Sequence, residues 1–101
     1  MIRHVVLFKF KDAASGSSKE QNIAKAKKLL ESLPGKISEI CNLETGLNIK
    51  EDPPNYDLAL IVDFDSLDDL ETYINHPDHK KVSEFLAKVR DNRVVVDFEM
   101  H

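Results

Sequence analysis

The chain has 101 residues, 42% of them hydrophobic and 32% charged, which allows one domain, residues 1–101, with one modest core. Its net charge of −4, with no lysine- and arginine-rich run outside the first helix, argues against nucleic-acid binding. No apolar run of about 18 residues is present to span a membrane, and a single cysteine without a signal peptide predicts a cytoplasmic protein.

Residues 3–10 predict a first strand that is largely apolar on both faces. Val5 and Leu7 lie on one face. The other face carries His4, Val6, Phe8 and Phe10. A strand covered on both sides needs a helical layer against one face and a further layer, such as a second subunit, against the other. The small and polar residues 11–18 predict a mobile loop.

A capping box is predicted to start the first helix, with Ser17 or Ser18 at the cap and the acidic or amide side chain three residues later bonding back. The apolar stripe of this helix consists of Ile23, Ala26, Leu30 and Leu33. Its lysines lie mostly off the stripe, and we interpret them as solvated surface. The Pro34-Gly35 pair is expected to end the helix.

Residues 36–50 predict a second strand with an irregular pattern, because Ile37 and Ile40 are out of phase with the apolar residues that follow. A β-bulge near residues 40–42 or around Gly46 would restore the phase. We interpret Cys41 as a small buried or edge residue of this strand rather than a nucleophile. Residues 51–55 predict a turn, because their two prolines remove backbone donors.

Residues 56–64 predict a third strand that is buried on both sides, with Leu58 on the same face as Leu60 and Val62. Asp65 or Ser66 is expected to cap a helix. That helix is expected to bury Leu67, Leu70 and Ile74. Four aspartates around this cap lack the glycine and distal glutamate of a calcium loop, and they suit the positive end of a helix better.

The segment His76-Pro77-Asp78-His79 predicts a corner between two helices, since proline suits the first position of a helix and His76 then lies near its cap. The stripe of the second of these helices, expected to end at about residue 91, comprises Val82, Phe85, Leu86 and Val89. Residues 93–100 predict a final strand whose polar side indicates a sheet edge or a partly solvated face.

The resulting order, βαββααβ, predicts an α+β fold of the ferredoxin-like type, a four-stranded antiparallel sheet with helices on one face. A chain of this size buries roughly 60 to 65% of its unfolded surface. Because the strands are apolar on both faces, we expect a homodimer that meets through the sheet face away from the helices.

Three segments, residues 2–11, 64–66 and 73–79, together resemble the Dabb family of stress-responsive dimeric α/β barrels. The resemblance covers nearly the whole chain, and its most specific parts are the His-x-Val-x-Phe-Lys strand and the Tyr-x-x-His-Pro-x-His corner. It implies a homodimer in which two four-stranded sheets meet as a barrel, with a cavity between each sheet and its helices.

The resemblance also implies roles for individual residues. A plant polyketide cyclase of this family uses a histidine at the position of His79 as general base, paired with a tyrosine at the position of Tyr73. Residues matching His4, Val6 and Phe8 line its cavity. Further positions of that cavity, among them the candidate ligand-binding residues Leu58 and Ile23, differ: a pocket histidine corresponds to Leu58, and bulky aromatic residues of the first helix correspond to Asn22, Ile23 and Ala26.

Two functions follow from this comparison. The first is a dimeric Dabb domain that binds a small organic ligand between sheet and helices, with no cofactor and no metal. The alternative is a cofactor-free cyclase or lyase in which His79 and Tyr73 transfer protons. Structural roles stay open for the three histidines: a hydrogen-bonded strand residue for His4, a helix cap for His76, and a helix start for His79. A zinc site built from these histidines is a weaker hypothesis.

Overall fold

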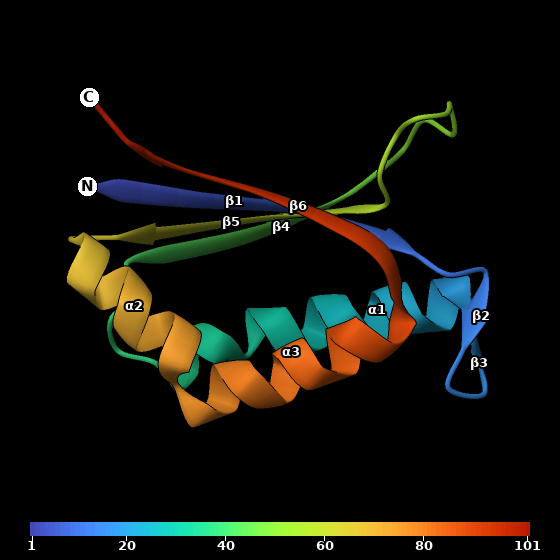
Figure 1. Ribbon diagram of the computed structural model, residues 1–101, viewed down its shortest axis with the longest axis horizontal. Helices are drawn as coiled ribbons and strands as arrows, with labels where there is room; N and C mark the ends of the chain where they lie inside the picture. The colour runs from blue at the N-terminus through green and yellow to red at the C-terminus, as the bar shows by residue number, and fades with distance from the viewer.

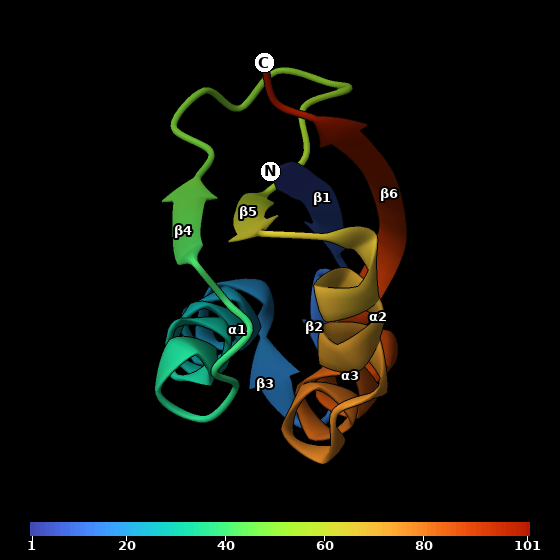
Figure 2. The ribbon, with the colours of Figure 1, turned by 90° about the vertical axis from the view of Figure 1, so that its left-hand side faces the viewer.

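A four-stranded antiparallel sheet forms one layer of the protein, and three helices form the other (Figure 1), in a computed structural model that describes residues 1–101. The strands lie in the order β4 (Asn42–Leu47), β5 (Leu58–Phe64), β1 (Ile2–Phe10) and β6 (Arg90–Glu99). The helices are α1 (Lys19–Glu31), α2 (Leu67–Asn75) and α3 (Pro77–Val89). All three cover the same face of the sheet (Figure 2), which confirms the predicted ferredoxin-like α+β arrangement.

The register of β1 decides which side chains face the helices. Val6 lies opposite Leu60 of β5 and opposite Val95 of β6. Since side chains alternate along a strand, His4, Val6, Phe8 and Phe10 all point to the helical layer, where each is buried. Val5 and Leu7 point to the opposite, open face of the sheet.

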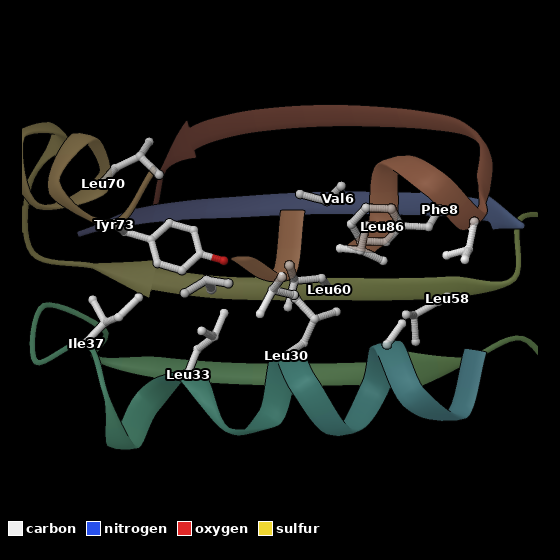
Figure 3. Packing of buried hydrophobic residues seen from close by; sticks show 14 of the residues in the cluster. Val6, Phe8, Leu30, Leu33, Ile37, Leu58, Leu60, Leu70, Tyr73 and Leu86 are labelled. Atoms are coloured by element: carbon white, nitrogen blue, oxygen red, sulfur yellow. The ribbon is translucent and has the colours of Figure 1, made fainter. Parts of the chain in front are cut away.

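Sixteen buried apolar residues form one core between the sheet and the helices. Figure 3 shows Leu30 of α1 and Leu33, which lies two residues beyond the end of α1, packing beneath the sheet, on the same side as Tyr73 of α2 and Leu86 of α3. The predicted core position of Leu30 is confirmed, because only 1% of it is exposed. Phe85 is only half-buried at the margin of this core, so its predicted core position is wrong in part.

Helix α2 buries a narrower stripe than expected. Leu70 is buried and Ser66 caps the helix, accepting a hydrogen bond from the Asp69 N–H at 3.2 Å. Leu67 and Ile74, however, are exposed. The helix is short and its buried face is completed by Tyr73, which takes the space beneath the sheet that Ile74 was expected to fill.

Residues 11–18 contain a short hairpin instead of the predicted mobile loop. Its strands are β2 (Ala13–Ala14) and β3 (Ser17–Ser18), joined by Ser15 and Gly16, both at positive φ as a tight two-residue turn requires. The buried Asn22 side chain fixes this hairpin to α1 by donating to the Ala14 carbonyl at 3.0 Å. Ser18 and Gln21 then form the capping box, the second of the two predicted pairs.

The second strand is shorter than the predicted residues 36–50. A 3₁₀ turn, η1 (Leu33–Gly35), and an irregular segment precede β4, so Ile37 and Ile40 are out of phase because they lie outside the strand. No bulge is needed. Cys41 also lies just outside the strand, where it is exposed, so its predicted place within a strand is wrong.

The remaining strands differ from the prediction mainly at their ends. β5 begins at Leu58, two residues late, because the Asp57 side chain accepts a hydrogen bond from the Phe10 N–H at 2.7 Å and fixes the chain before the ladder starts. β6 follows α3 directly at Arg90 and forms the predicted sheet edge. None of the helices is long and apolar enough to cross a membrane.

Candidate functional site

A single residue, His76, forms the corner between α2 and α3. It is the C-cap residue of α2 and the N-cap residue of α3. Its Nδ1 accepts a hydrogen bond from the Asp78 N–H at 3.1 Å. The predicted cap role of His76 is therefore confirmed. Because the extended backbone at His76 turns the chain sharply, residues of both helices reach the same space beneath the sheet.

His79 lies in the first turn of α3 and bonds back across this corner. Its Nδ1 lies 3.1 Å from the Ile74 carbonyl oxygen, which can only accept, so Nδ1 carries the proton and Nε2 has a free lone pair in the neutral ring. Burial lowers the pKa of His79, and the positive charge of Arg93 lowers it further, as do His4 and His76 whenever their rings are protonated, against the opposing effect of the Ile74 bond. His79 is therefore a neutral base at pH 7.

Tyr73 lies at the centre of the histidines. Its ring centroid is 4.4 Å from that of His79 and 6.1 Å from that of His4. The Tyr73 hydroxyl is buried and has no hydrogen-bond partner in the protein. Figure 3 shows this hydroxyl directed along the core, away from the outer end of α2. Burial raises the pKa of Tyr73 well above its usual value, which keeps the phenol protonated as a hydrogen-bond donor.

His4 is held from the neighbouring edge strand. Its Nδ1 lies 2.5 Å from the Asp97 carboxylate, directly opposite on β6, and the His4 side chain is 5% exposed. An ionised carboxylate can only accept, so this pair places the proton of His4 on Nδ1 and leaves Nε2 free. The predicted hydrogen-bonded role of His4 and its place in the cavity wall thus coexist.

A cavity of about 470 Å³ opens beneath the sheet at these residues. Its walls come from β1, β5, β6 and all three helices, and they include five of the residues that the sequence suggested: His4, Val6, Phe8, Tyr73 and His79. Nine of its 16 lining residues are hydrophobic, and the others are polar or charged. This volume and this composition are typical of small-molecule sites in proteins.

Two other candidate ligand-binding residues do not reach this cavity. Ile23 lies two helical turns before Leu30, the residue of α1 that lines the cavity, and instead borders a separate hollow of about 770 Å³ next to residues 47–57. The walls of that hollow are mostly charged side chains of both signs on the protein surface. Leu58 is buried in the core, and Leu60, two residues along the same face of β5, lines the cavity in its place.

Comparison with models of protein families shows the family to which the chain belongs. The model of the stress-responsive A/B barrel domain, Dabb, matches residues 2–100. The chain belongs to this family. A comparison with curated proteins gave no match.

Solved structures show the same Dabb fold. A dimeric ferredoxin-like protein of unknown function from Bacteroides fragilis is 35% identical, with a TM-score of 0.83, over 98% of this chain and 95% of that one. A dimeric ferredoxin-like protein from Thermobifida fusca is 30% identical, with a TM-score of 0.84, over 98% and 90%. A hydroxynitrile lyase from Passiflora edulis, 20% identical over 99% and 93% with a TM-score of 0.80, shares the fold.

The cavity of this Dabb domain also contains residues that sequence reasoning missed. Arg90 and Arg93 of β6 both line it. Arg93 lies on the same side of β6 as Asp97, and this polar side was interpreted as solvated edge. The alternation along β6 was the available signal, but only its pairing with β1 shows that the polar side faces the helices.

The histidines do not form a metal centre. No group of three or more histidine, cysteine, aspartate or glutamate side chains lies close enough to hold a metal ion. The Nδ1 atoms of His4, His76 and His79 all face protein partners. The polar groups that line this cavity include the phenol of Tyr73, the imidazoles of His4 and His79, and the guanidinium groups of Arg90 and Arg93.

Proposed function

We propose that this chain is a dimeric Dabb domain that binds a small organic molecule in the cavity between His4, Tyr73 and His79. The observation that supports this best is the buried Tyr73 hydroxyl without a protein partner. Leaving a buried polar group unpaired costs about 1 to 3 kcal/mol. A bound ligand whose oxygen accepts a hydrogen bond from this hydroxyl would remove that cost.

The two groups beside this ligand oxygen are complementary. The protonated phenol of Tyr73 donates, and the free Nε2 of His79 accepts. A ligand hydroxyl or enol can therefore accept from Tyr73 and donate to His79 at once. Val6, Phe8 and their apolar neighbours surround the carbon skeleton of the ligand.

The homodimer we propose meets through the open face of the sheet. Apolar side chains from three strands gather there: Val5, Leu7, Ile61, Val94, Val96 and Phe98. A contiguous exposed patch of this kind is typical of an interaction surface. Relatives with 30% and 35% identity are described as dimeric, which supports this assembly. We further propose that the dimer is cytoplasmic, where the exposed Cys41 stays reduced.

A second function, proton transfer without a cofactor, rests on the same pair of residues. A neutral His79 beside a phenol is the pairing that a cofactor-free cyclase or lyase needs. Incubation of a bound carbon acid in deuterated water distinguishes the two functions. Deuterium uptake that His79→Gln abolishes indicates catalysis, whereas recovery of the unlabelled compound indicates binding alone.

Thermal-shift screening with two cavity variants tests the proposed binding. Ala87→Phe puts a bulky ring at the wall of the histidine cavity, and Ala24→Phe puts the same ring in the separate hollow beside α1. Compounds that bind as proposed raise the melting temperature of the wild type and of Ala24→Phe, but not of Ala87→Phe. Equal responses in all three proteins would contradict the proposed site.

A further inference from the structure

Unpaired cations gather in the wall of the histidine cavity, although the chain as a whole is acidic. The charged side chains that line the cavity are Lys80, Glu84, Arg90 and Arg93, three cations against one carboxylate. None of the four has an ion pair or a side-chain hydrogen bond, whereas Arg3, the third arginine of the sheet, is paired with Asp63. The net charge of −4 makes this local excess of positive charge unusual for the molecule.

The position of Arg93 directs its charge toward the polar centre of the cavity. Arg93 lies opposite Phe8 on the helix-facing side of β6. Its charge lowers the pKa of both Tyr73 and His79, so the guanidinium acts on the two groups proposed to hold the ligand. Asp97, the carboxylate on the same side of β6, is bound to His4 and is not paired with Arg93.

Arg90 adds a second guanidinium at the same end of the cavity. It follows the last residue of α3, where its backbone N–H bonds the Leu86 carbonyl, and the residue is partly buried. Like Arg93, it lines the cavity. Guanidinium groups bind carboxylates and phosphates through paired, charge-assisted hydrogen bonds.

We propose that the ligand of this cavity is an amphiphilic acid, an apolar body with a carboxylate or phosphate head group that Arg93 and Arg90 bind. The inference rests on the proposed ligand binding and adds the chemical class. The apolar body occupies the space lined by Val6, Phe8 and Leu60. The head group stays at the rim, because Arg93 is exposed.

Three probes with the same alkyl chain test the class: decanoate, decyl phosphate and the neutral decanamide. Calorimetry measures their affinities for the wild type, Arg93→Gln, Arg90→Gln and the control Lys81→Gln. Lys81 is an exposed residue of α3 outside the cavity, so this control removes one positive charge without touching the site. NMR of the His79 ring shows whether each probe occupies the cavity.

We expect at least one acid to bind the wild type about tenfold or more tightly than decanamide, as a charge-assisted hydrogen bond allows. Arg93→Gln should remove most of this preference, Arg90→Gln part of it, and Lys81→Gln none. The acid whose affinity falls more in Arg93→Gln carries the head group, carboxylate or phosphate, that the arginines bind. If decanamide binds in the cavity as tightly as both acids, or if Arg93→Gln weakens acids and amide equally, the acid inference is wrong while ligand binding stands. If no probe perturbs the His79 ring, the acid inference is wrong, and the thermal-shift screen with Ala87→Phe and Ala24→Phe decides ligand binding separately.

Discussion

The rings of Tyr73 and His79 lie 4.4 Å apart, centroid to centroid, although the two residues belong to different helices. The corner at His76 produces this proximity, because it ends α2 and starts α3 with a single residue. The same bond that completes the corner, from His79 Nδ1 to the Ile74 carbonyl, leaves Nε2 free. A helix start and a polar site are therefore built from the same residues.

His79 should titrate below the ordinary histidine value of 6.5 in an NMR pH titration of its ring protons. Burial is the main cause, and the charge of Arg93 acts in the same direction, as do His4 and His76 when they are protonated. In Arg93→Gln the pKa of His79 should rise, because one of the opposing cations is removed. Titration at or above 6.5 would show that the ring is solvated and would exclude His79 as a buried base.

The lowered pKa of His79 also predicts a pH dependence of folding. As the pH falls through 6.5, the unfolded chain takes up a proton on this residue before the folded chain does, so the free energy of unfolding decreases. The control His79→Gln lacks this contribution. Urea melts between pH 7.5 and about pH 5 should therefore show a steeper loss for the wild type than for the variant; parallel curves would contradict this.

Val96→Glu should convert the proposed dimer into a monomer in sedimentation velocity. Val96 lies on the open face of the sheet, where a charge would be buried against the second subunit without a partner. Val95→Glu is the matched control, because this neighbour is on the opposite side of the same strand and is similarly exposed, 47% against 55%. A dimer that survives Val96→Glu, or that Val95→Glu disrupts equally, would place the interface elsewhere.

Leu30→Ala should lower the free energy of unfolding by about 2 to 5 kcal/mol, the usual cost of truncating a buried leucine. Phe85→Ala should cost less, since part of its ring is already exposed and its contact with Lys25, 4.5 Å from the ring centroid, contributes only about 0.5 to 1 kcal/mol. Denaturant melts of both variants check the order. A larger loss for Phe85→Ala would mean that the core is centred on α3 rather than between α1 and the sheet.

The Arg3–Asp63 pair should make the protein sensitive to acid. Arg3 donates two hydrogen bonds to this buried carboxylate, at 2.8 and 3.0 Å, and they lower the pKa of Asp63 below 3.8. The stabilisation is present above pH 3.8 and is lost as the pH falls through the folded-state value. Arg3→Gln should therefore destabilise the protein at pH 7 but much less near pH 2. An equal loss at both pH values would show that Arg3 acts through packing.

The sequence predicted the architecture well because its periodic patterns are local. The alternation in β1 and the stripe of α1 each follow from a few neighbouring residues, and so does the proline that starts α3. The errors arose where distant segments decide the outcome. The hairpin at residues 13–18 depends on Asn22, and the start of β5 depends on a side chain bonded to β1.

The candidate site was predictable in part for the same reason. The corner motif and the resemblance to the family indicated His79 and Tyr73, and the structure places both in one cavity with His4. Arg93 was missed because only the pairing of β6 with β1 turns its side chain toward the helices. Ile23 and Leu58 were proposed because they match pocket positions of a related cyclase. Such a match does not show which turn of a helix or which residue of a strand borders the cavity in this protein.

The stability of Tyr73→Phe, with and without decanol, tests the central claim most directly, because the hydroxyl of decanol can accept from Tyr73 and donate to His79. If the unpaired hydroxyl serves a ligand, its removal relieves a cost of about 1 to 3 kcal/mol in the free protein, so the variant should be at least as stable as the wild type. Saturating decanol should then raise the melting temperature of the variant less than that of the wild type. A variant that is less stable on its own and gains as much from decanol would contradict a ligand-binding role for Tyr73.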